Sequence, residues 1–174
     1  MLYYNISLMK NFLFIGAFLY FLLIYFPFEV YGQNSVSISG TNTGSIQMTA
    51  PLIPGSPVET VIDESKWLNY NISVAPDDPS VSISVHIASG ALPNGLRLQL
   101  QAGSFQGTGE GGITSGNLTL SNIPQVLISN IRRCNTGTGI NFGHQLTYRY
   151  TISDYSAVIA SNSSLEILFT INTD

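Results

Sequence analysis

The sequence predicts an all-β protein, an antiparallel β-sandwich that follows an N-terminal signal segment. Apolar and polar residues alternate with period two in several segments, and no stretch of a dozen residues keeps its apolar positions at helical spacing. Clusters of Gly, Pro, Asn and Asp separate these segments about every ten residues. This pattern fits two stacked sheets of Greek-key or jelly-roll type with about eight strands. A closed barrel is the structural alternative.

Residues 1–32 have the parts of a secretory signal. Lys10 precedes an apolar run over residues 12–26, which Pro27 ends. Val30 and Gly32 occupy the −3 and −1 positions, so we expect cleavage before Gln33. The run is shorter than the roughly 20 residues of a spanning helix, which makes an uncleaved anchor the weaker alternative. We therefore expect a secreted or cell-surface protein that meets the membrane only through this segment before cleavage.

Two regions follow the signal. Residues 33–57 are rich in Ser, Thr, Gly and Pro, and form a leader with candidate strands at 35–39 and 45–49. Residues 58–174 form the predicted sandwich. The clearest strand there covers residues 80–87, with apolar residues on one face and Ser82, Ser84 and His86 on the other. The other predicted strands cover residues 58–62, 67–74, 96–101, 117–120, 126–131, 146–153 and 165–172.

The composition narrows the class of protein. Only 9% of the residues are charged, against about 25% in an ordinary soluble domain, and the net charge is −4. A chain without clustered Lys and Arg is not expected to bind nucleic acid. The one cysteine, Cys134, cannot form a disulfide within the chain. We interpret it as a small buried residue, with an intermolecular disulfide or a reactive thiol as alternatives.

The sequence contains no pattern that predicts a catalytic, metal or cofactor site. A zinc site needs three or four converging ligands, and His86, His144 and Cys134 are scattered along the chain. Trp67, Asn69 and Asn71 should share the polar face of one strand. An exposed indole beside amides can cover the C–H face of a sugar while the amides bind its hydroxyls. These three residues are therefore the candidate carbohydrate-binding surface. Their alternative is coverage by a loop or by the second sheet.

The last 90 or so residues resemble a group of bacterial proteins. The stretch at residues 148–155, followed by residues 165–172, resembles the final hairpin of bacterial secreted β-sandwich proteins of the fimbrial-subunit and spore-coat-like type. Two segments resemble uncharacterised small secreted bacterial proteins more closely, Cys134-Asn-Thr-Gly-Thr-Gly139 and Gly143-His-Gln-Leu-Thr-Tyr148. Fimbrial subunits usually pair two cysteines, and this chain has one. The resemblance implies the fold and no activity.

The function expected from these observations is structural or adhesive and non-enzymatic. Such a protein would act through sheet surfaces and strand edges, with itself or with other surface proteins as partners. A carbohydrate-binding module that uses Trp67, Asn69 and Asn71, with glycans as partners, is the alternative. A secreted hydrolase is a third hypothesis, which requires His86 or His144 in contact with a carboxylate and a serine.

Overall fold

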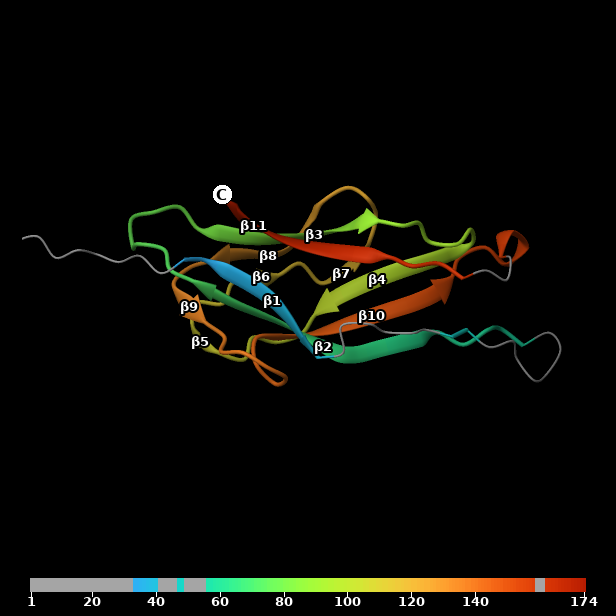
Figure 1. Ribbon diagram of the computed structural model, residues 1–174, viewed down its shortest axis with the longest axis horizontal. Helices are drawn as coiled ribbons and strands as arrows, with labels where there is room; N and C mark the ends of the chain where they lie inside the picture. The colour runs from blue at the N-terminus through green and yellow to red at the C-terminus, as the bar shows by residue number, and fades with distance from the viewer. Residues whose placement is uncertain (1–32, 41–46, 49–55, 159–161) are drawn as a thin grey trace, which may run out of the picture. The chain divides into compact units, whose positions relative to one another are not determined.

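The described part of the chain is a β-sandwich, which confirms the predicted fold class (Figure 1). The computed structural model describes residues 33–40, 47–48, 56–158 and 162–174. These residues belong to one compact unit. The predicted signal and most of the strand expected at residues 45–49 lie outside the described residues.

The larger sheet, called sheet A, has seven antiparallel strands. β1, β2, β10, β4 and β7 lie side by side in that order, and the short β9 and β5 continue the sheet beyond the end of β10. The strands are β1 (Ser35–Gly40), β2 (Val61–Ile72), β4 (Leu96–Ala102), β5 (Thr108–Gly109), β7 (Asn117–Thr119), β9 (Cys134–Asn135) and β10 (His144–Ile152).

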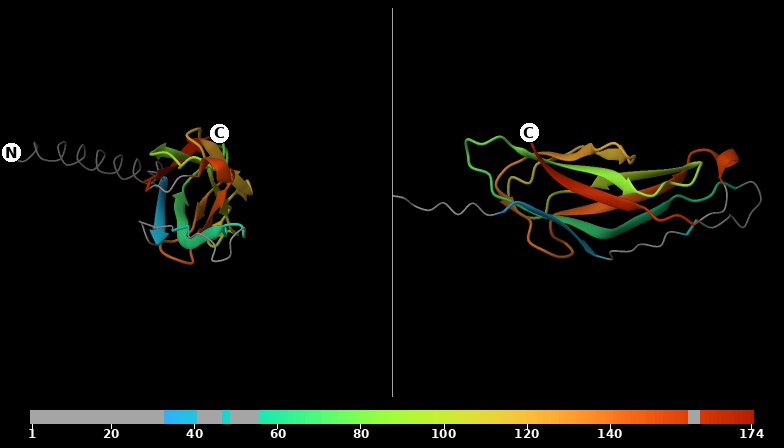
Figure 2. Two further views of the ribbon diagram at one scale, coloured as in Figure 1. Left: turned by 90° about the vertical axis from the view of Figure 1, so that its right-hand side faces the viewer. Right: turned by 45° about the horizontal axis from the view of Figure 1, so that its top comes forward.

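The smaller sheet, called sheet B, has four antiparallel strands in the order β11-β3-β8-β6. They are β3 (Val81–Ser89), β6 (Ile113–Thr114), β8 (Gln125–Ile131) and β11 (Glu166–Thr173). The C-terminal β11 therefore forms one margin of its sheet, as the two views of Figure 2 show. A single 3-10 turn, η1 (Tyr155–Ala157), lies between β10 and β11.

The core lies between the two sheets, where the alternating apolar side chains meet. Leu68, Leu98 and Leu146 from sheet A and Ile83 and Ile128 from sheet B are fully buried. Fully burying a side chain of this size contributes about 1.5–3 kcal/mol. The period-two pattern of the sequence thus identified the inward faces of β2, β3, β4 and β10 correctly.

Three features of the sheets differ from expectation. The described residues form eleven strands rather than about eight, because β5, β6 and β9 have two residues each and show no alternation. β1 pairs with β2 over its whole length, so it is an integral strand of sheet A and not a loose leader. The two strands expected at residues 58–62 and 67–74 are a single strand, β2. The polar residues 63–66 interrupt the alternation of apolar and polar residues in the sequence. In the structure they lie at a β-bulge, where the register between β2 and β10 shifts.

Candidate functional site

The structure places the three predicted sugar-binding residues in very different environments. Trp67 is half-buried and pairs with Ser39 of β1 and Gln145 of β10. Asn71 is exposed, but Asn69 is only 2% exposed. The prediction that Asn69 lies on an accessible face is therefore wrong, and the three residues do not form one continuous binding surface.

Asn69 is buried because strand β1 and the loop between β9 and β10 cover it. Its Oδ1 accepts hydrogen bonds from the Ser39 hydroxyl and, at 3.2 Å, from the Gly139 N–H. Its Nδ2 donates to the Phe142 carbonyl oxygen at 2.7 Å. The amide thus supplies partners for two backbone groups of the loop, which is a structural role.

The accessible part of sheet A is its outer face, where side chains lie in rows across the strands. Arg149 of β10 stands opposite Gln99 of β4, and Thr147 stands opposite Gln101. Thr119 and Asn117 of β7 extend these two rows. Side chains directly opposite one another in an antiparallel pair have Cβ atoms about 5 Å apart, so each row is a continuous strip of polar groups.

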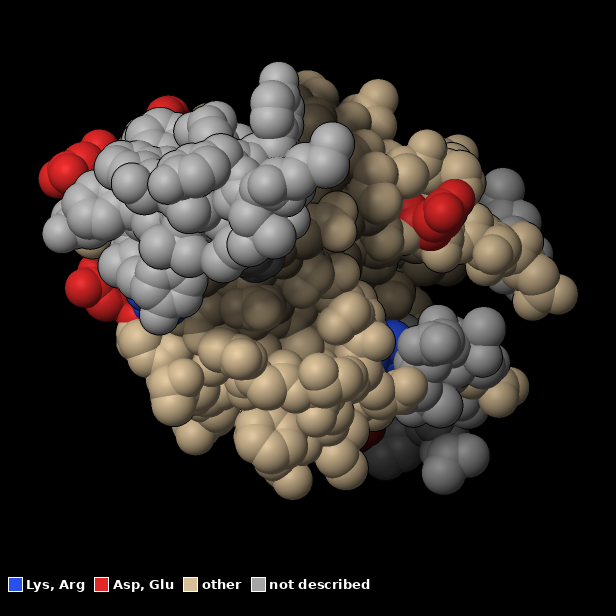
Figure 3. All heavy atoms as spheres, turned by 60° about the vertical axis from the view of Figure 1, so that its left-hand side comes forward, with Lys and Arg blue, Asp and Glu red and all other residues tan. Residues whose placement is uncertain are grey.

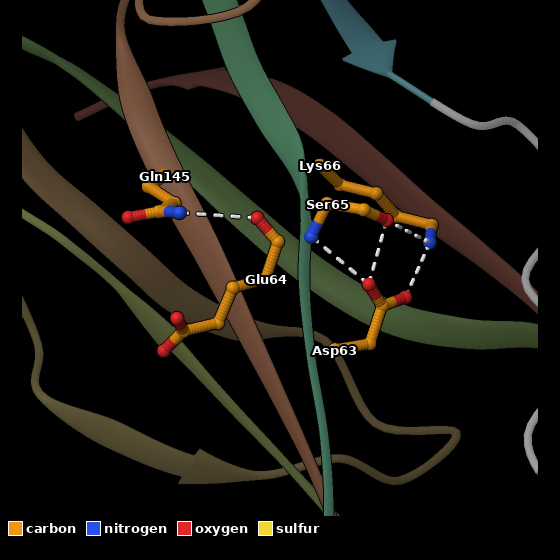
Figure 4. A network of polar contacts seen from close by, with 5 residues as sticks. All are labelled: Asp63, Glu64, Ser65, Lys66 and Gln145. Atoms are coloured by element: carbon orange, nitrogen blue, oxygen red, sulfur yellow. Dashed lines mark hydrogen bonds and ion pairs between the residues drawn. The ribbon is translucent and has the colours of Figure 1, made fainter.

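A polar network lies on β2 at its bulge (Figure 4). Asp63 accepts hydrogen bonds from the backbone N–H of Ser65 at 2.9 Å, from the Ser65 hydroxyl and from the Lys66 ammonium. Burial would raise the pKa of Asp63, but the hydrogen bonds from Lys66 and Ser65 outweigh it and hold the pKa below its usual value. Gln145 fixes the other side of the bulge by donating to the Glu64 carbonyl oxygen at 3.1 Å.

The second polar cluster is inside the core. His144 is 1% exposed, its Nδ1 lies 2.7 Å from the Gly103 carbonyl oxygen, and its Nε2 lies 2.8 Å from the Tyr70 hydroxyl. The Tyr70 hydroxyl also donates to the Gly111 carbonyl oxygen. Burial lowers the pKa of His144, although the carbonyls of Gly103 and Gly111 act in the opposite direction. Burial also raises the pKa of Tyr70, so both groups are neutral at pH 7.

The residues required by the hydrolase hypothesis do not come together at His144. Its hydrogen bonds among the described residues go to Tyr70 and Gly103, and include neither a carboxylate nor a serine. The Nδ1 atom of His86 is buried without a partner in the described part of the chain. Cys134 is buried, as predicted, and burial raises the pKa of its thiol to about 11.

Two features are absent from the described residues, a metal-binding cluster and a membrane-spanning helix. No group of three or more His, Cys, Asp or Glu side chains is placed to hold a metal ion within residues 33–40, 47–48, 56–158 and 162–174. None of the helical segments in this part of the chain has the length and apolar character that crossing a bilayer requires.

The C-terminal strand β11 has a partner strand on one side only among the described residues. β11 pairs with β3 along one side, and Asp174 N–H extends the ladder by donating to the Ser80 carbonyl oxygen at 3.0 Å. Successive residues of a strand point their backbone groups to opposite sides. Leu168, Thr170 and Asn172 are in phase with Asp174 and bond to β3, so the backbone groups of the intervening residues point away from the sheet.

Comparisons of the chain with models of protein families, with curated proteins and with solved structures found no match. The resemblance to fimbrial-subunit and spore-coat-like proteins therefore stays a prediction.

Proposed function

We propose that this protein is an exported, non-enzymatic structural protein that joins other copies of itself by strand addition at β11. The observation that carries the proposal is the outer edge of β11, which has no partner strand among the described residues, is eight residues long and has Glu166 as its single charged residue. Such an edge offers an unused row of N–H and C=O groups to another chain.

The contrast with the other edges of the sandwich supports this proposal. Three of the other edge strands, β5, β6 and β7, have only two, two and three residues, and an edge this short gives little backbone for pairing. The remaining edge strand, β1, is uncharged like most of β11 but is two residues shorter. β11 has no proline, no lysine and no inward-pointing charge, which are the usual means of protecting an edge. Its one bulge lies at the start, between Glu166 and Ile167.

The side chains of β11 also fit an interface. Ile167, Phe169 and Ile171 pack against the core but stay partly exposed, and Leu168 on the other face is 46% exposed. A second strand beside β11 would cover these apolar groups further, at about 25 cal/mol for each Å² removed from water. Glu166 is the single charged residue of β11, so few like charges would face one another between two copies joined at this edge. Figure 3 shows that uncharged side chains also cover most of the described surface on the left-hand side of the view in Figure 1, with Asp and Glu at its margins.

The proposal places this assembly outside the cytoplasm. The signal pattern of residues 1–32 is the basis for placing the protein outside the cytoplasm. A surface of hydroxyl and amide groups with few charges is compatible with dense packing of many copies. The proposal therefore places the protein in a secreted or surface-held assembly.

The test is the self-association of the full-length protein, measured by sedimentation velocity over a range of concentrations. We expect the wild type to associate and the Leu168→Lys/Thr170→Lys double variant to remain monomeric. Both residues have outward side chains on β11, so antiparallel pairing of two edges would bring the introduced lysines of the two copies together. Gln101→Lys is the control, because it adds a lysine at an exposed position of the interior strand β4.

A wild type that is monomeric at every concentration would refute the proposal. Equal association of the wild type and the β11 variant would also refute it, because assembly would then use another surface. Circular dichroism of each variant shows whether the fold is intact.

A further inference from the structure

The outer face of sheet A carries two arginines that have no acidic partner among the described residues. Arg97 stands opposite Thr151 and Arg149 stands opposite Gln99, so the two arginines are diagonal neighbours on adjacent strands. Diagonal neighbours lie about 7–8 Å apart. Both arginine side chains are exposed. The single ion pair among the described residues is on a different strand, β2, and joins Lys66 to Asp63.

Polar rows continue from this arginine pair along the strands. The row of Arg149 and Gln99 is followed by the row of Thr147 and Gln101, and then by Gln145 with the half-buried Trp67. Alternate residues of a strand are about 6.8 Å apart, so the surface from Arg97 to the row of Trp67 is about 20 Å long. It has cations at one end, amides and hydroxyls in the middle and an indole at the other end. The Glu64 carboxylate lies at the border of the middle part, where it accepts a hydrogen bond from the Thr147 hydroxyl at 3.2 Å.

We infer that this face binds an acidic polysaccharide, with uronate carboxylates on Arg97 and Arg149. Guanidinium groups pair with carboxylates through two parallel hydrogen bonds. The amides of Gln99 and Gln101 both donate and accept, as the hydroxyl groups of a sugar require. The Thr147 hydroxyl donates to Glu64 and offers its oxygen as an acceptor. The exposed part of the Trp67 ring offers an apolar surface to the C–H face of a further sugar.

The chemistry of the face favours a glycan over a peptide. The backbone groups of β10 and β4 are bonded to neighbouring strands on both sides, so this face offers only side chains to a ligand. An extended peptide gains most of its affinity from backbone pairing at a sheet edge, which this face lacks. A polyuronate has hydroxyl groups on every sugar and carboxylates at intervals. It therefore matches a surface of amides and hydroxyls that also contains two guanidinium groups.

The site differs from the surface expected from the sequence and is independent of β11. It keeps Trp67, excludes the buried Asn69, and adds residues of β4 and β10 that are far from Trp67 in the chain. Association of copies through β11 leaves the outer face of sheet A open. Loss of glycan binding and loss of self-association can therefore be measured separately.

The test is affinity electrophoresis of the full-length protein in gels that contain polygalacturonate, neutral dextran or poly-glutamate. We expect polygalacturonate alone to retard the wild type. Arg97→Gln/Arg149→Gln should weaken that retardation about tenfold or more and make it less sensitive to salt. Arg133→Gln is the matched control, because Arg133 is an exposed arginine in the turn between β8 and β9.

Each outcome decides the proposal. Absence of retardation by polygalacturonate would overturn it, and so would an equal effect of Arg133→Gln. Retardation by poly-glutamate as strong as by polygalacturonate would show an unspecific response to charge and reject a glycan site. Retention of polygalacturonate binding by the double variant would place the binding elsewhere.

Trp67→Ala should weaken polygalacturonate binding while Arg97 and Arg149 stay in place.

Discussion

At the scale of single residues, Asn69 shows how a polar side chain on the outward face of a strand becomes structural. The face is outward with respect to the core, but Ser39 of the neighbouring strand β1 and the β9–β10 loop contact Asn69 there. A buried amide that satisfies backbone groups cannot be removed without leaving those groups without partners. Asn71, two residues further along the same face, remains exposed and has no such role.

We expect Asn69→Ala to lower the free energy of unfolding by about 2–3 kcal/mol, because it leaves the Phe142 carbonyl and the Gly139 N–H without their partner. Urea unfolding, followed by the fluorescence of Trp67, measures the change. Asn71→Ala is the matched control and should change the free energy by less than about 0.5 kcal/mol. Similar losses in the two variants would contradict the structural role of Asn69.

At the scale of elements, the His144–Tyr70 pair connects parts of sheet A that are distant in sequence. Tyr70 belongs to β2 and His144 to β10, while Gly103 follows β4 and Gly111 lies between β5 and β6. The pair therefore fastens two loops to the centre of the sheet. The titratable group beside Tyr70 is the thiol of Cys134. Burial raises the pKa of this thiol and keeps it neutral at pH 7. No charged side chain among the described residues offsets the cost of protonating His144.

Stability should consequently fall in mild acid. The pKa of His144 is lower in the folded than in the unfolded protein, where it is about 6.5. The unfolded chain therefore binds more protons below this pH, and the free energy of unfolding decreases as the pH falls below about 6.5. One histidine contributes a slope of at most about 1.4 kcal/mol per pH unit.

Urea unfolding between pH 7.5 and about pH 5 measures that slope, and His144→Gln should reduce it. His86→Gln is the control, because it removes the other histidine and leaves the contact between His144 and Tyr70 in place. An equal reduction in both variants would show that the slope does not come from His144.

At the scale of the whole molecule, the sandwich is stabilised by one continuous core without a disulfide bond. The core joins both sheets and includes Cys134, which is 4% exposed and packs at the end of β2. Burial raises the pKa of its thiol to about 11, although a backbone hydrogen bond to Ile72 acts the other way. The thiolate is the reactive form of cysteine, so both burial and pKa protect Cys134 in the folded protein.

Alkylation of Cys134 by iodoacetamide at pH 8 should therefore report unfolding of the sandwich. We expect no labelling within hours in native buffer, and labelling in urea that rises in the same range as the change in Trp67 fluorescence. Coincident transitions would indicate two-state unfolding of the sandwich. Rapid labelling without urea would show that the region around β9 opens separately and would contradict a single cooperative core.

The sequence by itself determined the class of fold and the inward faces of β2, β3, β4 and β10. Side chains on a strand alternate with period two, so Leu68, Ile83, Leu98 and Leu146 could be assigned to the core from spacing alone. The two-residue strands β5, β6 and β9 were missed because a pattern needs several residues to appear.

Only the tertiary structure decided what covers the other faces and which edges stay free. Asn69 is buried where it accepts hydrogen bonds from Ser39 and Gly139 and donates one to Phe142, and these residues come from segments 30 to about 70 positions away. The pairing of Arg97 and Arg149 on one face, and the free side of β11, likewise depend on the order of strands in the sheets. Local spacing determines the direction of a side chain, whereas its accessibility depends on which distant strand or loop lies above it.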